Sequence, residues 1–372
     1  MNRILCITCI LAGLFYGAAV AVPADDLVAR SGVTGGFVVH LGCGDGKLTA
    51  ALHLNDRFTV QGLDADSTAV ARARAYIQSQ GLYGPVSIEQ FDGCRLPYAD
   101  NLINLMVVED AGKVSTDEIL RTLVPNGVAL VKNKVTGWRK IVKPQSATTD
   151  EWSHFLHDAG NNAVANATGV GPPRRLQWVA PPLWLRSHET PSGVQAEVSS
   201  SGRLFYILDE GLIGIVDQRL PDRWAIVCRD AYNGKLLWKR YLKAWGWREW
   251  NRAKWEGKDW TAMRSFRMDV PQENERRLVA IGDRLYATLS YMAPMSILDA
   301  VTGDTLVTVE ETRPAREIVV NDGIAVVRVD KSDTSATNRR RGIRSIDKSN
   351  VVAVDGDHVR FINAPYAASP VS

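Results

Sequence analysis

Residues 37–49 read FVVHLGCGDGKLT, an apolar run followed at once by a glycine-rich turn. The apolar run has the length and the β-branched content of a buried strand. Glycine at Gly42, Gly44 and Gly46 lets the backbone turn tightly and lets a ligand approach without a Cβ in its way. A helix is expected to begin near Lys47, so this stretch predicts a strand, a ligand-binding turn and a helix.

The sequence around this stretch alternates short apolar runs with helical stretches from Gly36 to Asn133. Such alternation is typical of a parallel sheet whose strands are joined by crossover helices. The predicted strands are Phe37–Leu41, Thr59–Leu63, Val86–Gln90, Leu102–Val108 and Val128–Lys132. The predicted helices are Ser67–Gln80, capped by Ser67, and Ser115–Leu123, which opens with a capping box of Ser115 and Glu118. We therefore expect a Rossmann-like, doubly wound α/β fold in the first half of the chain.

Three carboxylates follow the predicted strands, at the edge where open α/β sheets bind ligands. Asp64 ends the second strand, in the position of an acid that binds both ribose hydroxyls. Asp45 lies where the pyrophosphate of a dinucleotide would rest, and a carboxylate there repels phosphate but attracts an ammonium group. Asp92, just after the third strand, is placed to accept a hydrogen bond from an adenine amino group. S-adenosylmethionine carries a ribose, an adenine and an ammonium group and no phosphate, so these residues favour it over a dinucleotide.

Four motifs in this half resemble those of the class I S-adenosylmethionine-dependent methyltransferases, in the same order. They are Val39–Thr49, Gly62–Asp66, Leu96–Asn101 and Glu118–Gly127. The resemblance covers about residues 36–133. It implies that Gly42, Gly44 and Gly46 form the cofactor loop, that Asp64 holds the ribose and that Asp92 faces the adenine.

The sequence assigns no catalytic residue. The family usually has two more strands after the fifth, whereas here a polar stretch without apparent structure, Lys140–Asp150, follows. No side chain in Glu109–Gly112 is identified as a base, although methyl transfer can proceed by alignment of the acceptor alone. A methyltransferase on an unknown acceptor is the first hypothesis, and a non-catalytic scaffold that binds an envelope protein is the alternative.

The second half has different building units, short alternating strands separated by Gly and Asp turns. Residues Gly202–Ile207 recur as Gly282–Ala287 and, weakly, as Gly323–Val327, and Arg229–Trp238 recur as Leu298–Val307. An interval of 41 residues separates Gly282 from Gly323, a blade-sized period for a β-propeller. The units predict two clear blades and a third that is less regular, whereas a closed propeller needs at least about four.

The unit Ala231–Trp238 resembles the pyrroloquinoline-quinone-type propeller repeat, in which the Trp docks one blade onto the next. The segment Trp152–Asn162 is similar to the one that opens such propellers in exported bacterial proteins. A quinone-dependent dehydrogenase is a third hypothesis, but no calcium site and no acidic base for the quinone is identified. We therefore expect no bound pyrroloquinoline quinone.

Two further features of the second half have open interpretations. His154 and His157 have the H-x-x-H spacing of metal ligands, but without a third ligand a polar opening loop is favoured and no metal is expected. All 11 Trp residues follow residue 137, and five of them lie between Trp245 and Trp260. An exposed cluster there would favour a protein-binding surface, and a buried one would indicate packing.

The N-terminus predicts export. A positive start at Asn2-Arg3, an apolar run to Val20 and the small residues around Ala21 are typical of a signal peptide, with a membrane anchor as the alternative. The only membrane contact expected is through this signal, and the predicted location is the periplasm or cell envelope. A net charge of +3 argues against nucleic-acid binding. The expected divisions are a signal peptide (1–22), a methyltransferase-like domain (23–140), a linker (141–150), propeller repeats (151–330) and a polar, basic C-terminal segment (331–372).

Overall fold

The computed structural model describes residues 22–133, 137–169, 171–172, 176–181, 193–211, 222–250, 252, 256–257, 259, 270–330, 349–356 and 358–365. The predicted signal peptide, two of the clustered Trp residues and the basic stretch near residue 340 lie outside these ranges. None of the helices in these ranges is long and apolar enough to cross a membrane.

The first half is a six-stranded sheet in the order β3-β2-β1-β4-β5-β6. Strands β1 to β5 pair in parallel, and β6 runs antiparallel to β5. The strands are β1 (Gly36–Leu41), β2 (Phe58–Asp64), β3 (Val86–Gln90), β4 (Ile103–Val108), β5 (Leu123–Asn133) and β6 (Gly137–Val142). The five predicted strands and the Rossmann-like fold are thus confirmed. The expectation that the chain loses structure at Lys140 is wrong, because β6 extends the sheet to Val142.

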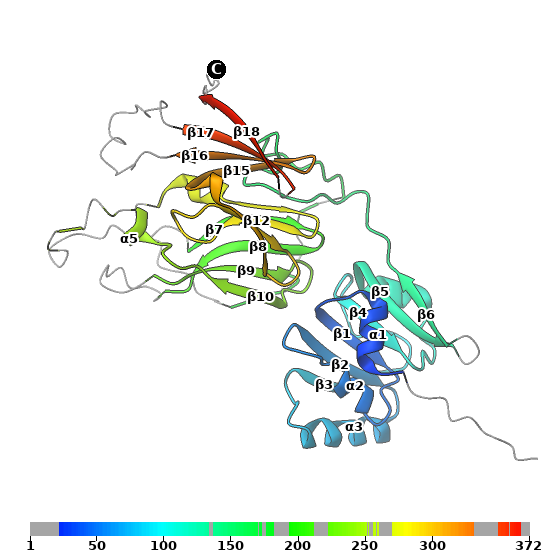
Figure 1. Ribbon diagram of the computed structural model, residues 1–372. Helices are drawn as coiled ribbons and strands as arrows, with labels where there is room; N and C mark the ends of the chain where they lie inside the picture. Colours follow the sequence, from blue (N-terminus) through cyan, green and yellow to red (C-terminus); the bar gives the residue numbers. More distant parts are fainter. Residues whose placement is uncertain are drawn as a thin grey trace, which may run out of the picture.

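Helices pack against this sheet (Figure 1). Apolar side chains form a core on each of its two faces. The helices are α1 (Ala24–Ser31), α2 (Lys47–Ala51), α3 (Ser67–Ser79) and α4 (Thr116–Thr122). Asp66, and not Ser67, caps α3, because its carboxylate accepts the N–H of Thr68 at 2.9 Å. Ser115 caps α4 as predicted, but Glu118 does not complete the capping box and instead bonds to the N–H of Leu96 and to Arg121.

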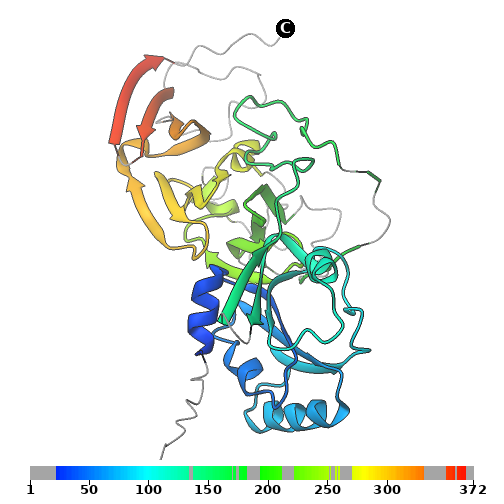
Figure 2. The same cartoon turned by 90° about the vertical axis from the view of Figure 1, so that its right-hand side faces the viewer.

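The second half consists of three four-stranded antiparallel sheets, in the orders β10-β9-β8-β7, β11-β12-β13-β14 and β15-β16-β17-β18. Their strands are β7 (Val194–Ser200), β8 (Arg203–Asp209), β9 (Trp224–Asp230), β10 (Leu236–Tyr241), β11 (Leu278–Ile281), β12 (Arg284–Thr288), β13 (Met295–Asp299), β14 (Thr305–Val309), β15 (Ala315–Asn321), β16 (Ile324–Asp330), β17 (Ser349–Asp355) and β18 (His358–Pro365). Short helices α5 (Trp247–Trp250), η2 (Gln272–Arg276) and η3 (Glu310–Thr312) connect them. The sheets follow one another away from the first half (Figures 1 and 2). No closed ring is found within the described residues.

Trp238 joins the first of these sheets to the second, and Trp178 joins the segment before β7 to the first sheet. The indole N–H of Trp238, on β10, donates to the carbonyl of Ala300 at 3.0 Å, beside the turn that follows β13. Trp178 bonds in the same way to the carbonyl of Ala231 in the turn after β9. A Cβ at Gly303 would lie 2.8 Å from the Trp238 ring, so the glycine of each turn provides the space for the indole. These two tryptophans are therefore packing residues.

The segment at Trp152 lies across all three sheets. The carbonyl of Trp152 accepts the N–H of Ser199 on β7, and the carbonyl of Ser153 accepts the N–H of Ala280 on β11. Nε2 of His154 accepts the N–H of Val320 on β15 at 3.0 Å. Three consecutive residues thus bond to β7, β11 and β15, the first strand of each sheet, which we call the inner strands.

Candidate functional site

The three glycines of the turn after β1 have two different structural roles. All three have positive φ, at +77° for Gly42, +54° for Gly44 and +80° for Gly46. A Cβ at Gly42 would meet the backbone nitrogen of Asp110 at 2.8 Å, and one at Gly46 would meet Ala73 at 2.9 Å. A Cβ at Gly44 would meet nothing within 4 Å. Internal packing therefore requires glycine at the outer two positions, whereas Gly44 borders open space where a ligand can approach the backbone.

Asp64 lies at the end of β2 and is oriented by the glycine turn. Its Oδ2 accepts the N–H of Gly44 at 3.0 Å, and its Oδ1 accepts the N–H of Asp66 at 3.0 Å. A carboxylate has about four lone-pair sites, so each oxygen can still accept a ribose hydroxyl. The acid is thereby held beside the open space at Gly44.

Asp92 and Asp45 are the other two predicted binding residues, and the structure places them differently. Oδ1 of Asp92 accepts the N–H groups of Cys94 and Arg95 at 2.8 Å each, and these bonds lower the pKa of its exposed carboxyl group. Oδ2 of Asp45 pairs with Nζ of Lys47 at 2.9 Å, which lowers the pKa of Asp45. Asp92 is thus fixed on the loop after β3, whereas an ammonium group would have to share Asp45 with Lys47.

The loops after β3 and β4 approach each other at their glycines. A Cβ at Gly93 would lie 3.4 Å from the side chain of Ala65, and one at Gly112 would lie 3.8 Å from the carbonyl of Gly93. The N–H of Glu109 donates to the carbonyl of Leu41, which joins the β4 loop to the glycine turn. The predicted site residues therefore come together at the carboxyl edge of the sheet.

A second group of polar residues at this edge was not predicted from the sequence. His40 lies on β1, Glu109 directly follows β4, and Lys132 lies on the neighbouring strand β5. Oε1 of Glu109 accepts a bond from Nζ of Lys132 at 2.6 Å, and its Oε2 lies 3.5 Å from Nε2 of His40. Nδ1 of His40 bonds to the hydroxyl of Thr49 at 2.8 Å. Contact with His40 and the hydrogen bond from Lys132 outweigh burial and lower the pKa of Glu109 to about 2.

Strand periodicity marks each member of this group, the His40–Glu109–Lys132 cluster, as a polar residue on a core face, but it does not show that the three meet. Side chains two residues apart on a strand point to the same face. His40 therefore shares a face with Val38, Glu109 with Val107, and Lys132 with Leu130, and these three apolar residues belong to the core. With its pKa near 2, Glu109 is ionised at neutral pH and is a poor general base. Its carboxylate can instead orient a donor group on a bound molecule.

His154 and His157 are structural residues. Nδ1 and Nε2 of His154 bond to Ser153 and to the N–H of Val320, and Nε2 of His157 bonds to Asp150 at 2.7 Å. Within the described parts of the chain, no group of three or more His, Cys, Asp or Glu side chains could hold a metal ion.

The second half docks at the opposite, amino edge of the sheet. Nδ2 of Asn104, at the start of β4, donates to Oδ2 of Asp230 at 2.6 Å, and Asn233 donates to Oδ1 of Asn104 at 2.7 Å. Asp230 is buried, and desolvation raises its pKa. Arg57, just before β2, donates to the carbonyl of Val301 at the same edge. All of these contacts lie at the amino edge, so they do not cover the candidate site at the carboxyl edge.

The described part of the tryptophan cluster is buried. Trp245, Trp247 and Trp250 are 4%, 1% and 6% exposed and belong to the core that joins the first two sheets of the second half. The hypothesis that this cluster forms an exposed binding surface is therefore wrong for these three residues.

Comparison with known proteins supports the identity of the first half. Residues 38–127 match the family model described as a methyltransferase domain. A Haemophilus influenzae protein of uncharacterised function is 30% identical over 168 residues, which cover 39% of this chain and 66% of that protein. S-adenosylmethionine is the cofactor that this domain and its edge residues indicate.

Two solved structures are similar to part of the chain. The [4+2]-cyclase SpnF is 25% identical over 30% of this chain and 45% of its own, with a TM-score of 0.27. A geranyl diphosphate C-methyltransferase from Streptomyces coelicolor, solved with S-adenosyl-L-homocysteine, is 17% identical over 29% of this chain and 43% of its own, with a TM-score of 0.26. The chain thus spans less than half the length of these two structures.

Proposed function

We propose that the first half transfers a methyl group from S-adenosylmethionine to an acceptor bound at the carboxyl edge of the sheet. The observation that carries this proposal is the open space at Gly44 beside the oriented carboxylate of Asp64. The ribose hydroxyls bind Asp64, the adenine amino group binds Asp92, and the amino-acid end lies along the glycine turn. When bound, the cofactor supplies an activated methyl group on its sulfonium.

The chain's own residues bind and orient the reactants. The backbone at Gly44 allows close approach, and Asp64 fixes the ribose. Glu109, ionised and held by Lys132, accepts a hydrogen bond from the acceptor or from the cofactor's ammonium group. Because Glu109, with its lowered pKa, is a poor general base, alignment of the acceptor supplies the rate enhancement.

Calorimetric titration of the full chain with S-adenosylmethionine tests this proposal. Wild type and Asp117→Ala, a control that removes an exposed acid on α4, should bind equally well. Asp64→Ala should bind at least about tenfold more weakly, because it loses hydrogen bonds to a charged group worth about 1.5 to 3 kcal/mol each. Absence of binding by the wild type, or equal binding by Asp64→Ala, would overturn it.

The second half is proposed to be a partial β-propeller of the pyrroloquinoline-quinone type, without the quinone. Three consecutive antiparallel sheets, docking tryptophans and adjacent inner strands support this architecture. We further propose export to the periplasm or envelope and the divisions of the chain given above. One observation favours the non-catalytic alternative, in which the chain is a scaffold that binds an envelope protein. The first two sheets of the second half contact the amino edge, so the last sheet lies away from that contact, where a partner could bind.

A further inference from the structure

A buried histidine at the candidate site has a ring nitrogen that faces a carboxylate without bonding to it. His40 and Thr49 are both 0% exposed, and Nδ1 of His40 bonds to the Thr49 hydroxyl at 2.8 Å. Nε2 of His40 lies 3.5 Å from Oε2 of Glu109 and has no hydrogen-bond partner among the described residues. The imidazole is thus held from the side of α2, and its other nitrogen is slightly too far from Glu109 for a good hydrogen bond.

Glu109 connects this nitrogen to the open side of the site. Its side chain is 31% exposed, and that of Lys132, which donates to Oε1 at 2.6 Å, is 50% exposed. The N–H of Glu109 donates to the carbonyl of Leu41 at 3.0 Å, so the carboxylate stands beside the glycine turn. A carboxylate has about four lone-pair sites, so Glu109 can accept a bond from a further positive group.

Uncharged residues surround the rest of the His40 ring. Its neighbours on the adjacent strands are Gly62 of β2 and Val107 of β4. Helices α1 and α3 belong to the core on the same face, and the residues that they bury are Ala24, Leu27, Val28, Ser31, Ala69, Val70, Ala73 and Ile77. None of these buried residues carries a charge.

The titratable groups of the neighbouring turns are held in other ways. Burial raises the pKa of the Cys43 thiol to about 12, which keeps it neutral. Asp45 pairs with Lys47 at 2.9 Å. Asp64 and Asp110 bond to backbone N–H groups. Within the described part of the chain, the charge that His40 meets is therefore that of Glu109, shared with Lys132.

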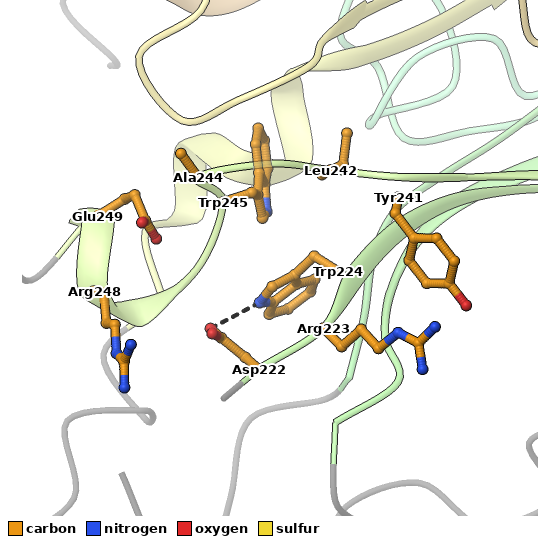
Figure 3. Close-up of a pocket in the computed structure, with 9 residues that line it drawn as sticks. All are labelled: Asp222, Arg223, Trp224, Tyr241, Leu242, Ala244, Trp245, Arg248 and Glu249. Atoms are coloured by element: carbon orange, nitrogen blue, oxygen red, sulfur yellow. Dashed lines mark hydrogen bonds between the residues drawn. The ribbon is translucent and has the colours of Figure 1, made fainter. Parts of the chain in front are cut away.

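A cavity in the second half shows the contrasting case of a carboxylate that the fold already uses. Its volume is about 330 Å³, and its lining includes Asp222, Trp224 and Glu249 (Figure 3). Oδ2 of Asp222 accepts the indole N–H of Trp224 at 3.0 Å and the backbone N–H of Trp247 at 2.9 Å. Asp222 therefore supports the buried tryptophans, whereas Nε2 of His40 supports no contact of the fold.

We propose that His40 and the ammonium group of S-adenosylmethionine compete for Glu109, which makes His40 a positioning residue for this carboxylate. This inference rests on the proposed function, because it takes the amino-acid end of the cofactor to lie along the glycine turn. A protonated His40 draws Oε2 of Glu109 inward, and a neutral His40 leaves it to the ammonium group. Two positive groups on one carboxylate repel each other, so the binding of either disfavours the other. When the cofactor binds, the proton of His40 passes to solvent.

The direction of the pH effect follows from this competition. Histidine ordinarily changes its charge between about pH 5 and pH 8. Amino groups like that of the cofactor titrate near pH 8, so the ammonium group keeps its charge below about pH 7. Glu109, with its pKa near 2, stays ionised over the same range. From about pH 7 to about pH 5.5, the affinity for S-adenosylmethionine should therefore fall about fivefold or more.

Calorimetric titration of the full chain with S-adenosylmethionine at both ends of this range tests the inference. Titrations in two buffers of different ionisation enthalpy count the protons released, and the wild type should release up to one proton for each cofactor bound. His40→Gln should bind equally well at both pH values and release no proton. His53→Gln, which changes a histidine beyond α2 and outside the cluster, should behave as the wild type does.

The comparison of buffers uses the wild type, so it decides the inference even if His40→Gln does not fold. The inference is overturned if the wild type binds the cofactor with equal affinity at both pH values and releases no proton. It is also overturned if His40→Gln keeps the pH dependence, or if His53→Gln loses it. Absence of binding at both pH values would overturn the proposed function, and this inference with it.

Discussion

Replacing Gly44 with alanine separates ligand binding from folding at the glycine turn. Gly44 has a φ of +54°, and a methyl group on its Cα would have no neighbouring atom within 4 Å. An L-residue in this left-handed region costs roughly 1–2 kcal/mol. Gly44→Ala should therefore unfold slightly earlier than wild type, by several degrees in Tm. Its new Cβ, however, occupies the space through which the cofactor approaches.

The expected loss of binding is much larger than the loss of stability. A methyl group that blocks this approach should reduce the affinity for S-adenosylmethionine at least a hundredfold, which corresponds to about 2.7 kcal/mol at about 1.36 kcal/mol per factor of ten. Gly81→Ala is the matched control, because Gly81 has a φ of +67°, also has no atom within 4 Å, and lies beyond α3, away from the site.

Calorimetric titration and thermal unfolding of the same preparations measure both effects. Gly44→Ala and Gly81→Ala should lose similar stability, whereas only Gly44→Ala should lose affinity. Binding by Gly44→Ala with wild-type affinity would refute the placement of the ligand at this turn. An equal loss in both variants would show that strain, and not occupancy of the space, weakens binding.

Three other substitutions test the remaining structural assignments. The pKa of Glu109 is lowered from 4.5 to about 2, so the ionised carboxylate stabilises the fold fully above pH 4.5. In urea unfolding, the difference in stability between wild type and Glu109→Gln should shrink as the pH falls toward 2. A difference that does not change with pH would contradict this. Asn104→Ala leaves Oδ2 of the buried Asp230 without its donor and should cost about 2 kcal/mol, so that calorimetric unfolding splits into two transitions. Gln177→Ala, which removes an exposed contact of the same edge, should leave one transition. Trp247→Ala should cost about 3–5 kcal/mol of stability, and loss of the near-ultraviolet circular dichroism signal should show that the second half unfolds. An unchanged spectrum would contradict the assignment of Trp247 to the core.

Strand periodicity and turn chemistry were sufficient to predict the five parallel strands and the helices between them, but not α1 or β6. The glycine turn and Asp64 were predictable because parallel strands must present their ends at one edge, and the structure brings both residues together there. The cap of α3 was assigned one residue too late, since Asp66 and Ser67 are both good capping residues and only the backbone conformation distinguishes them.

Contacts between distant segments were not predictable from local patterns. The His40–Glu109–Lys132 cluster depends on three strands that are adjacent in space but are separated by up to 92 residues in sequence, from His40 to Lys132. The same holds for Asn104, which bonds to Asp230 of the second half, 126 residues away in the sequence.

A parallel titration of the wild-type chain with S-adenosylmethionine and with NAD⁺ tests the central claim most directly. The two ligands share an adenine and a ribose, and they differ in the phosphates that Asp45 should repel. We predict saturable binding of S-adenosylmethionine and none of NAD⁺ at the same concentration. Failure to bind S-adenosylmethionine, or equal binding of NAD⁺, would contradict the assignment of the carboxyl edge as a methyl-donor site.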